Sequence, residues 1–249
     1  GSDCSPLVLI DGVEGDLNSV DASQIDQISV LKDAASAAIY GSRAANGVIL
    51  ITTKRADKGK FAVTYRGYVG WQSPVVYPDV VNAEEYMHLS RRASENDGAV
   101  SLYTDEYIAN YRRNNYLDPD AYPIIDWQDQ LMTGNGFTHN HTLSMSAGSE
   151  RIRVMTSLGY LDQNGIIKNA NFKRYNLRNN MDIRMNDRLN FRLDIAATYS
   201  RRAANPYQSS VFGFMNSKDP LMLAQWSDGS YAPFTGGTVN PLPMIEQGV

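Results

Sequence analysis

Strict alternation of apolar and polar residues constrains the fold of this chain more than any other feature of its sequence. The alternation begins at Phe61 and returns in four later runs, for example Leu189 and Phe191 against Asn190 and Arg192. A period of two is typical of a β-strand with one apolar and one polar face. The sequence therefore predicts five antiparallel strands, near residues 61–71, 138–147, 151–161, 172–185 and 188–200.

The connections between these strands alternate in length. Residues 148–150 and 186–187 are short turns, whereas residues 72–136, 162–171 and 201–249 are longer connections on the opposite side of the sheet. A membrane-spanning β-meander has this asymmetry, with short periplasmic turns and long outer loops. A tilted strand needs ~9 to 11 residues to cross a bilayer. The pattern therefore favours the first part of a β-barrel.

Charged residues gather on the polar face of the later strands. Adjacent strands could pair opposite charges there and present them to a plug or a hydrated lumen. A soluble sheet with one solvated face would give the same pattern. The lumen-facing candidates are Arg153, Arg178, Asp182, Arg184, Arg192 and Asp194.

Aromatic residues support two further hypotheses. Tyr160, Tyr175 and Tyr199 lie near the proposed outer strand ends, where a membrane barrel carries an aromatic girdle; scattered tyrosines are the alternative. Aromatic side chains in the long connections could stack on a glycan or pack inside the loops themselves. These residues are Tyr103, Tyr107, Tyr116, Trp127, Trp226 and Tyr231.

The first long connection also carries helix signals. Asn82 and Glu85 have the spacing of a capping box, and Thr104 is a candidate N-cap. We therefore predict two helices within residues 72–136. Residues 210–249 mix aromatic residues with Gly and Pro, and predict a second long loop.

The N-terminal residues predict a separate small α+β unit. Residues 6–13 form an apolar strand that ends in an Asp11-Gly12 turn. Residues 25–54 read as a strand, a helix of small residues over 34–39 capped by Asp33, a glycine-bearing loop and a buried strand. Residues 54–60 are a charged connector. The fold class is therefore α+β, with this unit followed by an incomplete antiparallel meander.

Composition narrows the functional classes. The chain has 249 residues and a formal net charge of -4, which argues against a nucleic-acid partner. Cys4 is the only cysteine, so neither an internal disulfide nor a zinc cluster is expected. No apolar run approaches the ~20 residues of a membrane helix.

Catalytic and metal interpretations are weak. Residues 41–47 lack the Gly-Lys-Ser/Thr ending of a phosphate-binding loop. His139 and His141 share one side of a strand and could hold a metal, although two polar strand residues are the more economical interpretation. Acidic pairs such as Asp126 and Asp129 fit loop and cap roles. We therefore expect no enzyme, no cofactor and no metal.

One stretch carries a family resemblance. Residues 28–54, ISVLKDAASAAIYGSRAANGVILITTK, resemble the plug-domain signature of TonB-dependent outer-membrane transporters, in the form found in the SusC/RagA branch. Residues 6–13, PLVLIDGV, are similar to the strand before that signature. The signature residues are Leu31, Lys32, Asp33, Tyr40, Gly41, Arg43, Asn46 and Gly47. Lys32, Asp33 and Arg43 could contact the barrel, or act as a cap and two solvated bases.

The resemblance implies a transporter of oligosaccharides or peptides that is driven by TonB and covered by a SusD-like lipoprotein. It divides the chain into the second half of a plug, residues 1–56, and the start of a β-barrel, residues 57–249 with outer loops 72–136 and 201–249. The resemblance places the parent protein in the outer membrane. Gly1-Ser2 resembles an expression scar, so the missing signal segment says little about compartment.

A full transporter of this kind closes ~22 strands. With five strands, we expect a fragment that does not transport by itself and that self-associates through its free sheet edge. A soluble carbohydrate-binding or adhesion module would also explain the alternation, because antiparallel sheets commonly bury one face and wet the other. It would not explain residues 25–54.

Overall fold

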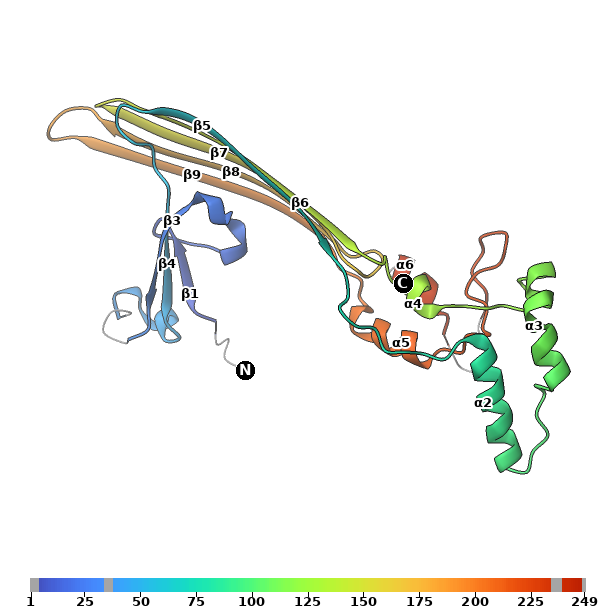
Figure 1. Cartoon of the computed structure of the whole chain (residues 1–249). Coiled ribbons are helices and arrows are strands. Elements are labelled where there is room, and N and C mark those ends of the chain that lie inside the picture. The colour runs from blue at the N-terminus through green and yellow to red at the C-terminus, as the bar shows by residue number, and fades with distance from the viewer. Residues whose placement is uncertain (1–4, 34–37, 234–238, 248–249) are drawn as a thin grey trace. The chain divides into compact units, whose positions relative to one another are not determined.

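A computed structural model describes residues 5–33, 38–233 and 239–247. Its strands form two sheets, and its longer helices lie in the connections between strands (Figure 1). The chain divides into two compact units. Unit 1 comprises residues 1–69, 139–162 and 172–201, and unit 2 comprises residues 70–138, 163–171 and 202–249.

Unit 1 begins with a four-stranded sheet, called here the small sheet, in the order β2-β1-β4-β3. β1 (Leu7–Ile10) and β2 (Val13–Glu14) form an antiparallel hairpin. The hairpin turns at Asp11 and Gly12, whose φ angles are 51° and 89°. Two consecutive positive φ angles are typical of a type I′ turn, which favours Asp-Gly. The predicted turn is confirmed.

The centre of the small sheet is β4 (Val48–Thr53), which pairs with β1 in parallel and with β3 (Ile25–Leu31) in antiparallel fashion. Gly47, just before β4, has a φ of 92°, and a Cβ there would lie 3.1 Å from the Leu31 carbonyl oxygen. Both restraints favour glycine at this position. Two apolar clusters bury side chains of β4. Val48 packs with Leu7 and Leu9 in one cluster, and Ile51 packs with Ile10 in the other.

The small sheet and the short 3-10 helices between its strands are together called here the small unit. These helices are η1 (Leu17–Ser19), η2 (Ala22–Gln24), η3 (Ala38–Tyr40) and η4 (Ser42–Ala44). Gly41, with a φ of 75°, separates the last two. The predicted helix over residues 34–39 falls mostly on residues 34–37, which lie outside the described residues.

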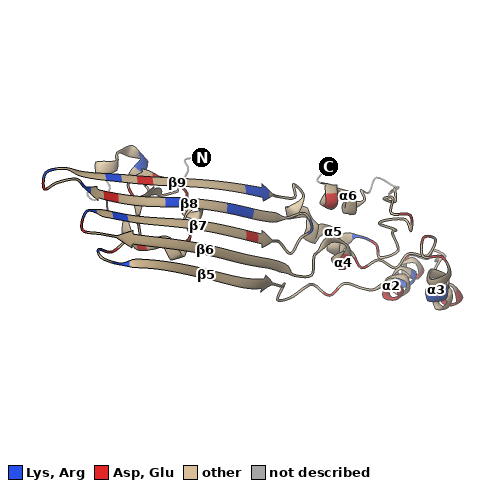
Figure 2. Ribbon diagram, turned by 90° about the horizontal axis from the view of Figure 1, so that it is seen from above, with Lys and Arg blue, Asp and Glu red and all other residues tan. Residues whose placement is uncertain are grey.

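Five strands form the second sheet, called here the long sheet, in sequential order β5-β6-β7-β8-β9 (Figure 2). They are β5 (Phe61–Gln72), β6 (Gly136–Gly148), β7 (Ile152–Asn164), β8 (Asn171–Arg184) and β9 (Asn190–Ala203). Each overlaps the strand expected there and differs from it by a few residues at its ends. β5 and β9 are the outer strands, so the sheet is not closed within the described residues. The predicted fold class, α+β with an incomplete antiparallel meander, is confirmed.

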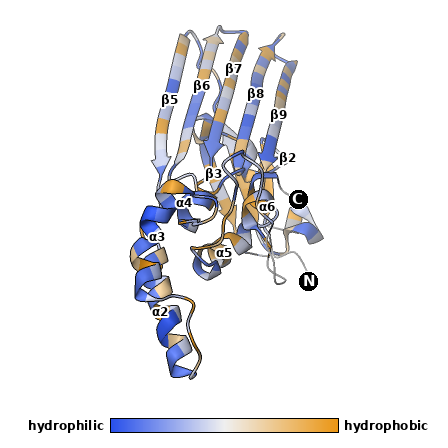
Figure 3. Cartoon of the chain, turned by 90° about the vertical axis from the view of Figure 1, so that its right-hand side faces the viewer, coloured by the Kyte–Doolittle hydropathy of each residue, from blue (hydrophilic) through white to orange (hydrophobic). Residues whose placement is uncertain are grey.

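The long sheet has two chemically different faces, visible as alternating bands of hydropathy along its strands (Figure 3). The apolar face carries Val63, Met145, Leu158, Leu177, Leu193 and their alternate neighbours, and these side chains are exposed. The polar face carries the residues between them, such as Asn140, Ser157 and Arg178, which are buried. On β6, β7 and β8, burial is thus the reverse of that in a soluble globular sheet, whereas β5 and β9 are exposed on both faces within the described residues.

Unit 2 contains the helices of the long connections: α2 (Ala83–Asn96), α3 (Asp105–Leu117), α4 (Trp127–Leu131), α5 (Val211–Ser217) and α6 (Pro241–Gln247). The Asn82–Glu85 capping box and the Thr104 cap are both present, as predicted. The core of this unit packs Leu131, Val211, Met215 and Ile245 around the Trp127 ring.

The sequence did not predict α4, α5 and α6. The Asn240-Pro241 pair, which resembles a turn, instead begins α6, where Asn240 Oδ1 accepts a hydrogen bond from the Leu242 amide. Proline fits the first turn of a helix because its missing N–H would have no partner there. Within the described residues, no helix is long and apolar enough to cross a membrane.

Candidate functional site

The polar face of the long sheet binds the small sheet through buried polar contacts. Arg178 of β8 donates from Nη1 to Asp11 Oδ2 at 2.9 Å, and both side chains are almost fully buried. Asp11 also accepts from Thr53, at 2.9 Å from the amide and 2.6 Å from the hydroxyl. The turn residue of the β1-β2 hairpin therefore connects two strands of the small sheet to β8. A buried pair of this kind is stable only while both charges remain.

A second contact reinforces the first. Asn180 Nδ2, two residues along the same face of β8, donates to Thr53 Oγ1 at 2.8 Å and to the Lys54 carbonyl at 3.0 Å. Thr53 therefore has partners in both sheets, and the Asn180 side chain fixes the end of β4 against β8.

An ionic cluster surrounds Arg55, the first residue of the connector beyond Lys54. Arg55 donates to Asp182 at 3.2 Å and to Asp194 at 2.6 Å. Asp182 also pairs with Arg153 at 3.4 Å and with Arg192 at 3.1 Å. Burial by itself would lower the pKa of Arg55, but the Asp194 and Asp182 carboxylates outweigh it and raise that pKa above the usual arginine value. The connector is therefore tied to β8 and β9 by charge, and Arg153 of β7 joins the same cluster through Asp182.

A third group of contacts lies at the η1 and η2 turns. Asn140 of β6 donates to Asp21 Oδ2 at 3.0 Å, and Arg174 donates to the Asn18 carbonyl. Burial would raise the pKa of Asp21, but hydrogen bonds from Ser23 and Asn140 and the charge of Arg174 lower it. The carboxylate form of Asp21 is therefore the one that binds the long sheet.

Five of the six lumen-facing candidates meet the small sheet, its connector or one another: Arg153, Arg178, Asp182, Arg192 and Asp194. The sixth, Arg184, lies at the end of β8 and pairs with Asp187 of the adjacent turn at 2.7 Å. Figure 2 shows acidic and basic residues interspersed along these strands.

The predicted signature residues lie mainly inside the small unit. Tyr40 and Leu31 pack against the core formed by Leu7, Leu9, Ala44 and Val48. Arg43 pairs with Glu14 of β2, and Lys32 and Asp33 are exposed. Gly41 and Gly47 supply the positive φ angles of the loop, and Asn46 precedes the second of them. The described contacts of Arg43 are therefore internal to the small unit.

The apolar face carries a continuous row of rings, called here the aromatic row: Tyr65, His141, Tyr160, Tyr175 and Tyr199, one from each strand of the long sheet. Neighbouring ring centroids are 6.1, 6.5, 4.9 and 6.2 Å apart in that order. Three of the five were expected in a girdle. Tyr65 and His141 were missed because the register between strands, which aligns them, cannot be read from one strand at a time.

The candidate substrate-contact aromatics differ in exposure. Trp127 is buried in the core of unit 2 and donates from its indole nitrogen to the Asp219 carbonyl at 3.0 Å. Tyr231 is partly buried and donates to Glu246 at 2.9 Å. Tyr103 packs against the core of α2 and α3, whereas Trp226 is 39% exposed. Trp226 is therefore the most exposed of these four, and of the other two loop aromatics Tyr116 is 88% and Tyr107 39% exposed.

A cavity of about 640 Å³ lies beside Trp127 in unit 2. Residues 79–83, 124–127 and 215–220 line it, together with Tyr86. Burial, followed by a hydrogen bond with Asp219, raises the pKa of Tyr86 to about 12. Tyr86 therefore stays a neutral hydroxyl at physiological pH.

Sequence reasoning missed the small-sheet half of the polar contacts, namely Asp11, Asp21, Thr53 and Arg55. In the sequence, Asp11 has an evident role as a turn residue, and Arg55 is one of several charged residues in a connector, so neither suggested a partner in the long sheet. Arginines outnumber aspartates among the polar-face candidates, and this excess of positive charge is a signal that could have pointed to the acidic partners Asp11 and Asp21. In the described part of the chain, no group of three or more His, Cys, Asp or Glu side chains is arranged to hold a metal.

Comparison with known proteins identifies the family to which this architecture is similar. The TonB-dependent Receptor Plug Domain family matches residues 2–48. TonB-dependent receptor P26 of Formosa agariphila is 32% identical over 238 residues, which cover 92% of this chain and 22% of that protein. TonB-dependent receptor SusC of Bacteroides thetaiotaomicron is 36% identical over 181 residues, which cover 68% of this chain and 16% of that protein.

Solved structures agree on the fold. The RagAB peptide importer in its closed-closed state superposes with a TM-score of 0.73 at 23% identity, over 97% of this chain and 31% of that one. The chain spans about a fifth of the length of the curated relatives it matches. These relatives are receptors and transporters rather than enzymes. In sequence and in fold, the chain belongs to the SusC/RagA type of TonB-dependent receptors.

Proposed function

We propose that this chain supplies part of the plug, residues 1–56, and the first barrel strands with their outer loops, residues 57–249, of an outer-membrane nutrient importer. The observation that carries the proposal is the division of the long sheet into a polar face bound to the small sheet and an apolar face left bare. A plugged barrel in a bilayer needs this arrangement, with lipid outside and polar groups inside.

The chemistry of the small-sheet contacts suits a plug that moves. Hydrogen bonds and ion pairs exchange readily for contacts with water, so separating the two sheets would expose little apolar surface. The small sheet keeps its own apolar core, built on Val48 and Ile51, and could move as a unit. Energy delivered through TonB would pull on the plug and break polar contacts rather than a hydrophobic core.

The substrate proposed is an oligosaccharide or a peptide, with a SusD-like lipoprotein as a lid over the outer loops. The peptide import named for RagAB supports the peptide class. The oligosaccharide class rests on the family resemblance of residues 28–54. Tyr103, Trp127, Trp226 and Tyr231 remain the proposed contact aromatics, with Trp226 the most exposed of the four. The chain alone is proposed to self-associate through β5, β9 and its bare apolar face.

A reversible cross-link tests the gating proposal in the complete receptor with Cys4 replaced by serine. Thr53→Cys with Asn180→Cys joins the small sheet to β8, where the native side chains are 2.8 Å apart. We expect uptake of the oligosaccharide or peptide to stop under oxidation and to return after reduction.

The matched control is Ser144→Cys with Ser157→Cys. These hydroxyls are also 2.8 Å apart, but both belong to the long sheet, so their cross-link should leave uptake unchanged. Normal TonB-dependent uptake with the first pair fully oxidised would contradict a moving plug.

A further inference from the structure

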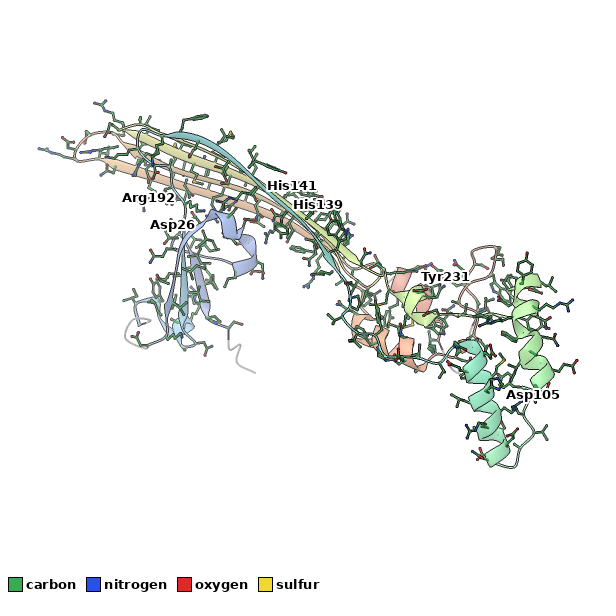
Figure 4. The ribbon with its side chains drawn as sticks, in the orientation of Figure 1. Asp26, Asp105, His139, His141, Arg192 and Tyr231 are labelled. Atoms are coloured by element: carbon green, nitrogen blue, oxygen red, sulfur yellow. The ribbon has the colours of Figure 1, made fainter. Side chains whose placement is uncertain are left out.

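Two imidazoles face each other on the apolar face of β6. His139 Nδ1 lies 3.2 Å from His141 Nε2, and the ring centroids are 5.3 Å apart. Figure 4 shows the two side chains beside one another on the long sheet. Residues two apart on a strand point to the same side, so this proximity follows directly from the sequence spacing.

The far nitrogen of each ring also faces an oxygen atom. His141 Nδ1 is 2.6 Å from the Tyr65 hydroxyl of β5. His139 Nε2 is 3.9 Å from Asp162 Oδ2 of β7. Histidines that bind metals usually direct their other N–H to a carboxylate or another oxygen, which fixes the ring tautomer and orientation. His141 therefore has an outer partner at hydrogen-bond distance, and His139 has a carboxylate nearby at ion-pair distance.

Asp162 is itself held in place for this role. Tyr160 donates to its Oδ2 at 3.0 Å, and Lys173 pairs with the same oxygen at 3.0 Å. The second oxygen, Oδ1, is buried and has no hydrogen-bond partner in the described part of the chain. A buried acceptor without a partner is costly, so a donor or cation in its vicinity would be stabilising.

We propose that His139 Nδ1 and His141 Nε2 bind a divalent transition-metal cation of the Zn²⁺ or Cu²⁺ class. Two nitrogens at ~2.0–2.1 Å from a tetrahedral zinc lie roughly 3.3–3.4 Å apart. The observed 3.2 Å is close to that separation, so the rings need little movement. In the metal-bound form both facing nitrogens are unprotonated. The ring protons sit on the far nitrogens, where His141 donates to Tyr65 and His139 points at Asp162.

The ligand set defines the class of metal and the character of the site. Imidazole favours zinc, copper and nickel, whereas calcium and magnesium require oxygen ligands. Within the described residues, no group of three or more His, Cys, Asp or Glu is arranged to hold a metal. His141 belongs to the aromatic row, which the proposed barrel places at the level of the lipid headgroups, where water can fill the remaining positions. The site is open and partly exposed, which suits reversible binding. In the alternative, the two rings share a proton in a hydrogen bond and bind no ion.

Metal titration of the whole chain, refolded in detergent micelles with Cys4 replaced by serine, separates these outcomes. We expect one Cu²⁺ per chain with the electron paramagnetic resonance signature of two imidazole nitrogens. Zn²⁺ should compete for the same site in an assay with a chromogenic chelator. A copper spectrum without imidazole nitrogens, or no binding at all, would overturn the proposal without requiring any variant to fold.

Substitutions provide a second test. His139→Gln and His141→Gln should each weaken Zn²⁺ binding at least about tenfold, because either change leaves one imidazole. Tyr65→Phe removes only an outer partner and should weaken binding by about 10-fold. His88→Gln is the matched control, because His88 lies on α2 in unit 2 and should leave affinity unchanged. An equal loss of Zn²⁺ affinity in all of these variants, including the His88→Gln control, would contradict the assignment. Unchanged affinity in every variant would contradict it as well.

Discussion

The two faces of the long sheet show how one strand pattern serves two different solvents. On the polar face, Arg178 and Asn180 are buried, and their partners belong to the small sheet. On the apolar face, Leu177 and Leu193 are exposed although they are hydrophobic. A soluble sheet would hide the second set and wet the first. Alternation alone therefore does not indicate which face of a sheet is inside. The contacts of the polar side chains do indicate it.

The faces also differ in what holds them together. The polar face depends on a few directional pairs, each of which loses its partner if one residue changes. The apolar face depends on rings and aliphatic chains that contact their neighbours across strands, where a single change removes only part of the contact. The effects of substitutions on stability should therefore differ between the two faces, both in size and in their dependence on the surrounding medium.

The largest effect is expected at the buried pair of Arg178 and Asp11. Arg178→Met leaves the Asp11 carboxylate buried without its cation, and should lower the free energy of unfolding by about 3–5 kcal/mol. Urea unfolding of the chain refolded in detergent micelles measures this change. Adding Asp11→Asn removes the stranded charge and should recover part of the loss, since asparagine also tolerates the positive φ of 51° at that turn. Additive losses in the double variant would mean that the two side chains do not interact.

A charge placed on the apolar face should have the next largest effect, and only in lipid. Leu193→Arg should cost about 2–4 kcal/mol in phospholipid vesicles, because an arginine would face the hydrocarbon. Asn190→Arg lies on the polar face of the same strand and serves as the control. Unfolding in vesicles compares the two. Equal stability of both variants would show that the apolar face does not contact lipid.

Removing one ring from the aromatic row should have a smaller effect. The ring centroid of Tyr175 lies 4.9 Å from that of Tyr160 and 6.2 Å from that of Tyr199, so Tyr175→Ala loses two ring contacts. Aromatic pairs contribute about 0.5–1.5 kcal/mol beyond their buried area. Tyr175→Phe keeps both rings in contact and should stay close to the native stability. If the two variants unfold alike in urea, the ring contacts do not contribute measurably.

The sequence predicted more about the strands than about what meets them. Alternation fixed the five strands and their faces because a period of two is a local property. The contacts of Arg55 with Asp182 and Asp194 join residues more than a hundred positions apart, and no local pattern encodes such a pairing. Ile28 and Val30 of β3 are exposed although they are apolar, and alternation with Gln27 and Ser29 indicates a strand without saying what covers it.

The second long connection shows a different limit of sequence reasoning. Residues 210–249 were predicted as a second long outer loop with no helix placed in it, yet α5 packs Val211 and Met215 into the core of unit 2. Gly213 lowers the helix propensity of this segment, and no side chain caps its start. Packing of the apolar residues overrides that local preference, and packing partners from distant segments are not visible in the sequence.

The smallest effect is expected at Asp21, where the polar face can be probed by pH. The folded pKa of Asp21 lies below its usual value of 3.8, so its ionised form stabilises the folded state. That stability is fully present above the unfolded pKa and is lost as pH falls through the lower folded pKa. Asp21→Asn cannot titrate, so the stability difference between native chain and variant should be constant above about pH 5 and should shrink below about pH 4. Urea unfolding across this range, measured on both proteins, gives the difference directly. A difference that grows on acidification would mean that the protonated carboxyl, rather than the carboxylate, binds Asn140.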